Sequence, residues 1–186
     1  MFQEHKLHHS TMRARGQAAL VGVGVGAATG FVLLGLGSRL AMRLIAVWTD
    51  PRVLVTLNGA VVGETTLEGT LRLALQGGIS GAVLGLGYVL VRRWLPEPRT
   101  WWFALVMLLL PGGVLLGDSE FELFHPPLLA ALLFLPVFPL YGFATALGVE
   151  RLAPPELAPA RPPLAVTGLA ALGLVVFVAN AVRVAV

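Results

Sequence analysis

The sequence predicts an all-α integral membrane protein: a bundle of about five transmembrane helices with a small extracytoplasmic β-hairpin between the first two. Three observations predict this fold. The 186-residue chain is 56% hydrophobic and only 12% charged, about half the charged fraction of a soluble globular domain. Five of its stretches stay uncharged over about the 20 residues that a helix needs to cross a bilayer. A turn-forming Asn-Gly pair lies between two apolar runs. This composition excludes a soluble enzyme, a disordered tail and a coiled coil.

The five predicted spans share one polytopic domain, residues 17–186, which follows a basic N-terminal segment, residues 1–16. They lie near 17–37, 73–91, 100–117, 126–149 and 164–182. We expect helices because isolated strands cannot satisfy their backbone hydrogen bonds in lipid. Pro111 in the third span and Pro136 and Pro139 in the fourth predict a bend or break in each.

The distribution of Lys and Arg predicts the orientation of the chain in the cell membrane. With the N-terminus in the cytoplasm, eight of the 13 basic residues lie on the cytoplasmic side and five lie outside. Cytoplasmic loops usually carry the excess of Lys and Arg. The loop that includes Arg92 and Arg99 is basic, whereas the loop from Asp118 to Glu122 contains no base. We therefore predict a cytoplasmic N-terminus and an extracytoplasmic C-terminus.

The segment between the first two spans is the largest one outside the predicted spans. Ser38–Trp48 either extends the first helix or lies along the membrane interface, and the sequence leaves both open. The pair Asn58-Gly59 between β-branched runs predicts the hairpin, with an irregular loop as the alternative. Residues Thr65 to Glu68 match a capping box, which predicts the start of the second helix.

Two stripes of glycine are the strongest packing signal. They consist of Gly22, Gly26 and Gly30 in the first span and Gly77, Gly81 and Gly85 in the second. A glycine at every fourth position lets helix backbones approach closely in lipid. We expect the stripes to pack these two spans against each other. An oligomer interface is the main alternative, and a glycine-lined pore is a minor one.

One short string suggests catalysis. Gly78-Ile79-Ser80-Gly81 resembles the GxSG nucleophile segment of rhomboid intramembrane serine proteases, and the resemblance would make Ser80 the nucleophile. In that family a histidine on another transmembrane helix activates the serine. A serine needs such a base, but the predicted spans contain no His, Asp, Glu or Lys. We therefore assign no catalytic residue and expect no enzyme activity; the rhomboid-like hydrolase is a remote alternative.

Three arginines are the charges that most need a functional explanation. Arg39, Arg43 and Arg72 lie near the outer ends of the first two spans, where topology alone does not favour basic residues. They either contact lipid headgroups and acidic side chains or bind an anionic ligand. The acidic loop from Asp118 to His125 is too irregular to predict a metal site.

These features predict a structural or accessory membrane component that packs through its glycine stripes. The alternative is a transport component for a small solute or an anionic ligand, with an outer site near Arg39, Arg43 and Arg72. We expect no cofactor, because the spans contain no histidine for haem and no lysine for a retinal Schiff base. The expected partners are the lipid bilayer and either further copies of the chain or a larger membrane complex. Nucleic acid is not expected, since the basic residues are dispersed as flanks of apolar segments.

Overall fold

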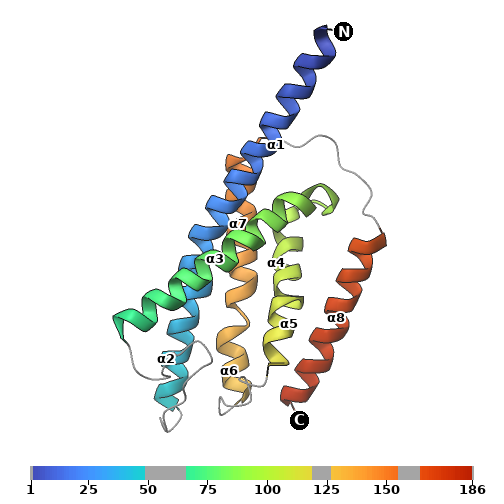
Figure 1. Ribbon diagram of the computed structural model, residues 1–186. Helices are drawn as coiled ribbons and strands as arrows, with labels where there is room; N and C mark the ends of the chain where they lie inside the picture. The colour runs from blue at the N-terminus through green and yellow to red at the C-terminus, as the bar shows by residue number, and fades with distance from the viewer. Residues whose placement is uncertain (1, 49–65, 119–126, 155–163, 186) are drawn as a thin grey trace.

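The computed structural model describes residues 2–48, 66–118, 127–154 and 164–185, and these residues are almost entirely helical (Figure 1). The elements are α1 (Phe2–Thr29), η1 (Gly30–Gly37), α2 (Ser38–Trp48), α3 (Leu67–Val91), η2 (Arg92–Trp94), α4 (Arg99–Leu109), α5 (Pro111–Leu116), α6 (Pro127–Phe134), α7 (Val137–Leu152) and α8 (Leu164–Ala185). The described residues contain no strand. The predicted hairpin falls in residues 49–65, outside the described residues, so the structure supports an all-helical fold without supporting a β element.

The first helix is much longer than predicted. The elements α1, η1 and α2 follow one another without a break, so Ser38–Trp48 extends the first helix. The basic N-terminal segment is helical too, and it projects beyond the bundle (Figure 1). The part apolar enough to cross a membrane, Arg13–Val47, has 35 residues. At 1.5 Å per residue it is about 50 Å long, which exceeds the roughly 30 Å hydrocarbon core of a bilayer.

The second long helix begins at the predicted capping box, before the apolar span 73–91. α3 starts at Leu67, and Thr66 is its N-cap, one residue after the predicted capping threonine. The Thr66 hydroxyl accepts a hydrogen bond from the backbone N–H of Gly69 at 3.1 Å. This bond satisfies one of the backbone donors left free in the first turn of a helix. The longer α3 places Arg72 inside the helix rather than at its end.

Proline breaks the third and fourth predicted spans where the sequence indicated. The third divides into α4 and α5 at Leu110, directly before Pro111, and the fourth divides into α6 and α7 at Leu135 and Pro136. Proline lacks a backbone N–H and clashes with the preceding turn. Pro139 is tolerated inside α7 because it lies in the first turn, where backbone N–H groups have no helical partner.

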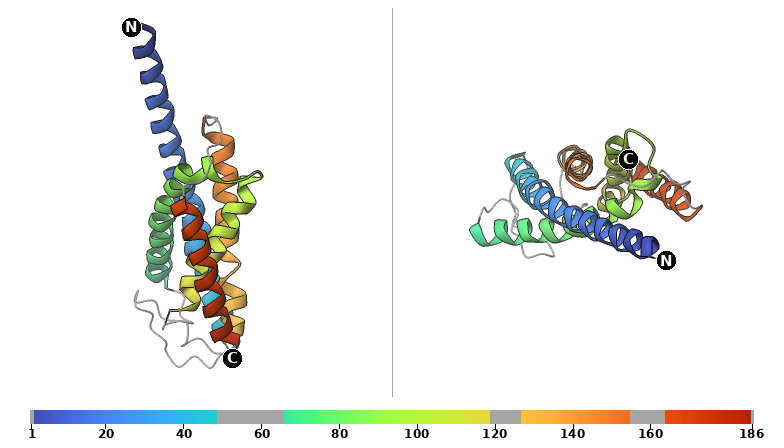
Figure 2. Two further views of the ribbon diagram at one scale, coloured as in Figure 1. Left: turned by 90° about the vertical axis from the view of Figure 1, so that its right-hand side faces the viewer. Right: turned by 90° about the horizontal axis from the view of Figure 1, so that it is seen from above.

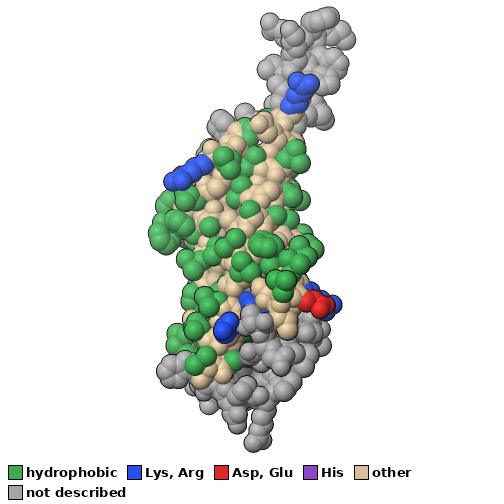
Figure 3. Space-filling model, turned by 90° about the vertical axis from the view of Figure 1, so that its left-hand side faces the viewer, with side chains coloured by type: hydrophobic (Ala, Val, Ile, Leu, Met, Phe, Trp, Pro, Cys, Tyr) green, Lys and Arg blue, Asp and Glu red, His purple; other side chains and the backbone are tan. Residues whose placement is uncertain are grey.

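The helices have the length and polarity of membrane spans. Four stretches qualify, namely Arg13–Val47, Leu67–Trp94, Arg99–Leu116 and Pro127–Leu152, and α8 adds a shorter apolar stretch, Ala171–Val184. On the face drawn in Figure 3, hydrophobic side chains cover the middle of the molecule, and the charged ones lie mostly towards its two ends. The termini lie at opposite ends of the bundle (Figure 1). These features support membrane localisation.

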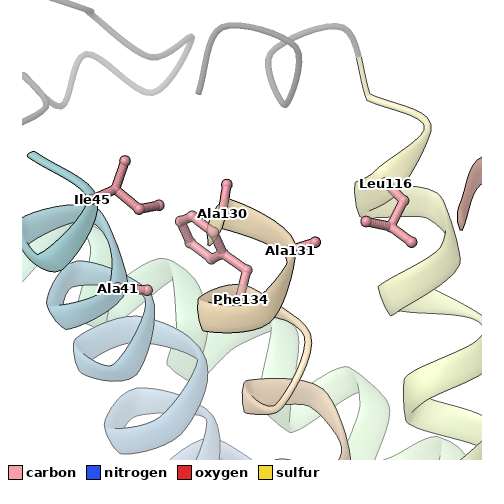
Figure 4. Close-up of a cluster of buried hydrophobic side chains, with 6 residues drawn as sticks. All are labelled: Ala41, Ile45, Leu116, Ala130, Ala131 and Phe134. Carbon is pink, nitrogen blue, oxygen red and sulfur yellow. The ribbon is translucent and has the colours of Figure 1, made fainter. Parts of the chain in front are cut away.

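Two clusters of buried side chains hold the bundle together. One joins α2, α5 and α6 and consists of Ala41, Ile45, Leu116, Ala130, Ala131 and Phe134 (Figure 4). The other joins α3, α4 and α7 and consists of Tyr88, Phe103, Met107, Tyr141, Ala146 and Val149. Two members of the second cluster also make polar contacts: Tyr88 bonds Glu150, and Tyr141 bonds the Gly81 carbonyl.

Candidate functional site

The helix pair formed by α1–η1 and α3 has backbones in direct contact. A methyl group added at Gly30 would lie 2.7 Å from the Cα of Gly81, and one added at Gly26 would lie 2.8 Å from the Cα of Gly85. The fit is reciprocal, because a methyl group on Gly85 would lie 2.8 Å from the Cα of Gly26. The obstructing atoms belong to the backbone, so a side chain at these positions requires the two helices to move apart.

The close approach extends along much of the helix pair. Gly22 meets Gly85 and the side chain of Val89 at one end of the contact, and Gly77 meets Gly30 and Gly35 at the other. Gly35 in η1, which the glycine stripes did not include, lies against Ala74: a methyl group added there would be 2.5 Å from the Ala74 Cα. The wide π-helical turns of η1 therefore lie where the first helix packs against α3.

Other glycines of the same helices make no such contact. An added methyl group at Gly24 in α1 or at Gly87 in α3 would meet nothing within 4 Å. Gly24 provides a matched control, since it shares the helical environment of the contact glycines and lacks the facing backbone.

Hydroxyl groups link the glycine-packed pair to α7. The hydroxyl oxygens of Thr29 and Thr145 lie 2.7 Å apart, and the Tyr141 hydroxyl donates to the backbone carbonyl of Gly81 at 2.7 Å. Thr145 and Tyr141 are fully buried. A buried hydroxyl without a partner is costly, so these bonds favour one arrangement of α1, α3 and α7.

We expect Thr145→Val to destabilise the protein by about 0.6 kcal/mol, with about 1.7 kcal/mol as the upper bound for hydrogen bonds between transmembrane helices. Valine keeps the shape of threonine and removes the bond to Thr29. Thr70→Val is the control, because the Thr70 hydroxyl donates to the Thr66 carbonyl within the first turn of α3. Reversible unfolding in mixed micelles measures both variants. An equal loss in the two would show that the contact between helices contributes nothing specific.

A cluster of charged and polar groups lies where α3, α4 and α7 meet, and Glu150 is its centre. One carboxylate oxygen of Glu150 accepts a hydrogen bond from the Tyr88 hydroxyl at 2.7 Å, and the other lies 3.4 Å from an Arg99 nitrogen. Arg99 also pairs with Glu97 at 3.1 Å. Arg92 is buried and donates to the Pro154 carbonyl at 3.1 Å. The cluster therefore connects the end of α7 to the turn between α3 and α4.

The sequence did not predict this cluster, because Glu150 directly follows the fourth predicted span, 126–149, where the apolar pattern ends. In the structure α7 continues to Leu152. Aromatic residues lie close to Arg92 and Arg99 in the sequence: Trp101 and Trp102 are exposed, and the Arg93 guanidinium lies 4.4 Å from the centre of the Trp94 ring. Tryptophan and arginine at one level of a bundle are typical of a membrane–water interface.

The three outer arginines do not occupy equivalent positions. Arg39 is buried, and one of its guanidinium nitrogens lies 3.6 Å from where a methyl group on Gly69 would be, beside the first turn of α3. Arg43, one turn further along α2, is exposed, and so is Arg72 on α3. Arg39 is thus packed within the fold, whereas Arg43 and Arg72 face outward.

Ser80 lies on the exposed side of α3. Its neighbour Gly81 faces α1, so the serine points away from the helix that packs closest to its own. A rhomboid-like site would need Ser80 to face a histidine on a second helix. Among the described residues, no three His, Cys, Asp or Glu side chains gather to hold a metal ion. Most of the acidic loop, residues 119–126, lies outside the described residues.

No protein-family model, characterised protein or solved structure matches this chain.

Proposed function

We propose that this chain is a non-enzymatic structural or accessory component of the cell membrane. The observation that carries the proposal is the close fit of α1–η1 and α3, whose backbones meet at Gly26, Gly30, Gly81 and Gly85. Helices that pack this closely gain dispersion energy along their length and resist relative movement. The buried hydroxyls of Thr145 and Tyr141 add specific bonds to the same helices. Such a bundle is suited to present fixed outer surfaces to lipid and to other membrane proteins.

The two alternatives have less support. A site for an anionic ligand at all three outer arginines requires Arg39 to be accessible, but Arg39 is buried beside α3. A rhomboid-like hydrolase requires Ser80 to face a base on another helix, but Ser80 is on the exposed side of α3.

Purification from native membranes in mild detergent tests the proposal. We expect the chain to elute with another protein or as more than one copy of itself. A lone monomer with nothing bound would contradict an accessory role. Labelling of Ser80 by a fluorophosphonate, which reacts with activated serines, would contradict the non-enzymatic part.

The proposed topology has the Glu150 cluster on the cytoplasmic side. The exposed residues Glu97 and Asp118 lie just beyond opposite ends of the α4–α5 span, and the chain contains no cysteine. We therefore expect Glu97→Cys to react with a membrane-impermeant maleimide only after cells are opened. Asp118→Cys should react in intact cells. Reaction of both from the same side would refute a span formed by α4 and α5, and the reversed pattern would place the N-terminus outside.

A further inference from the structure

A line of polar side chains follows the outer face of α3. Glu68, Arg72, Gln76 and Ser80 recur at every fourth position, which places them on one side of the helix. All four are exposed, and none makes a hydrogen bond or an ion pair with the other described residues. Figure 2 shows α3 at the edge of the bundle. We call these four residues the α3 polar stripe.

The stripe extends from the end of the span towards its middle. Ser80 lies eight residues beyond Arg72, about 12 Å along the helix axis. Glu68 and Arg72 are therefore near the membrane surface, whereas Gln76 and Ser80 reach into the apolar part of α3. Polar groups that face hydrocarbon without a partner are costly, and polar side chains within spans usually face another helix.

We propose that the α3 polar stripe is the contact surface between two copies of this chain, whose α3 helices pack side by side around a twofold axis along the membrane normal. The inference rests on the proposed accessory role and extends it by naming a partner and a surface. This dimer contact uses a different face of α3 from the glycine face, which packs against α1–η1.

The chemistry of the stripe is self-complementary, and this argues for a second copy rather than another protein. In a twofold contact each residue meets itself or a close neighbour on the other copy. The Gln76 amide and the Ser80 hydroxyl each carry both a donor and an acceptor, so each can pair with its own counterpart. Arg72 of one copy can pair with Glu68 of the other, one turn away.

The shape of the same face permits a close approach. Gly87 is seven residues beyond Ser80, on the same side of α3, and has open space around it. Small residues on one face of a helix let a second helix approach closely in lipid. The exposed side chains of Leu75, Ile79 and Val83 flank the stripe and supply apolar contact.

Dilution of the purified full chain in liposomes tests the proposal. Copies labelled with donor or acceptor dyes report dimers by energy transfer as the protein-to-lipid ratio falls. We expect Gln76→Leu to weaken dimerisation about tenfold, because hydrogen bonds between model transmembrane helices typically contribute 1–2 kcal/mol and 1.4 kcal/mol is a factor of ten. Gln17→Leu is the matched control, since Gln17 is exposed on α1 away from the stripe, and it should change nothing.

Charge reversal gives a second readout. Glu68→Arg and Arg72→Glu should each weaken the dimer, and the double variant should restore it because opposite charges again face each other. Oxidation should also cross-link Ser80→Cys between copies, but not Val175→Cys on the exposed face of α8.

Three outcomes would overturn the proposal: monomers at every ratio, dimers insensitive to Gln76→Leu, or a stripe-dependent complex with a different protein. The first and third would still leave the accessory role intact if native membranes yield a partner protein. The two hypotheses therefore fail separately.

Discussion

Replacing Gly26 by alanine is expected to lower the free energy of unfolding by about 2–3 kcal/mol. The added methyl group would lie 2.8 Å from the Cα of Gly85 and even closer to the carbonyl oxygen of Gly81. Neither atom can rotate away, so α1 and α3 must separate and lose part of their contact. Overpacking of this kind typically costs 1–3 kcal/mol. For a chain of this size, such a loss lowers the unfolding temperature by roughly 4–12 °C.

Gly24→Ala is the matched control, and it is expected to change stability in the opposite direction. Gly24 lies two residues away in the same helix and has nothing within 4 Å of an added methyl group. Alanine in a helix is favoured over glycine by up to about 1 kcal/mol, so Gly24→Ala should be neutral or stabilising. Unfolding of both variants in mixed micelles decides the question. If Gly26→Ala is as stable as Gly24→Ala, the glycine contact does not hold the helix pair together.

The features that the sequence predicted depend on local rules. Proline lacks a backbone donor and clashes with the preceding turn, so the helices break before Pro111 and at Pro136. Pro139 causes no break because it lies in the first turn of α7. Long uncharged stretches must be helical in lipid, so the positions of the spans were also predictable. The capping box at Thr65 to Glu68 is a local signal too, and α3 begins at Leu67 with Thr66 as its N-cap. The helix therefore starts before the apolar span 73–91, because a helix can continue beyond the hydrocarbon.

The features that the sequence did not predict depend on contacts between distant segments. Glu150 lies just beyond the fourth predicted span, because hydropathy detects only the apolar part of a helix. No residue near Glu150 in the sequence indicates that its hydrogen-bond partner is Tyr88. Likewise, the burial of Arg39 depends on how α2 lies against α3, and charge patterns alone place arginine at a surface. The regular spacing of Glu68, Arg72, Gln76 and Ser80 was visible, but only the packing of Gly77 and Gly81 on α1 determines that this line faces outward.

Removing the Glu150 carboxylate is expected to cost about 2 kcal/mol, because it leaves the fully buried Tyr88 hydroxyl without a partner. A hydrogen bond to a charged group contributes about 1.5–3 kcal/mol, and an unsatisfied buried donor costs a similar amount. The Tyr88 side chain has no exposed surface, and its hydroxyl lies 2.7 Å from the carboxylate. Glu150→Ala should therefore destabilise the protein strongly, whereas Tyr88→Phe, which removes the donor as well, should cost less.

The two substitutions should not be additive. Once Tyr88→Phe has removed the buried hydroxyl, Glu150→Ala should cost only its weak pairing with Arg99, because ion pairs near a surface contribute about 0–1 kcal/mol. A double-mutant cycle on unfolding in mixed micelles should thus give a coupling of about 1–2 kcal/mol. Glu97→Ala is the control: this carboxylate also pairs with Arg99, but its side chain is 76% exposed, and its loss should change stability by less than about 0.5 kcal/mol. A cycle with zero coupling, or a Glu97 effect equal to that of Glu150, would show that Glu150 stabilises the fold only as a surface charge.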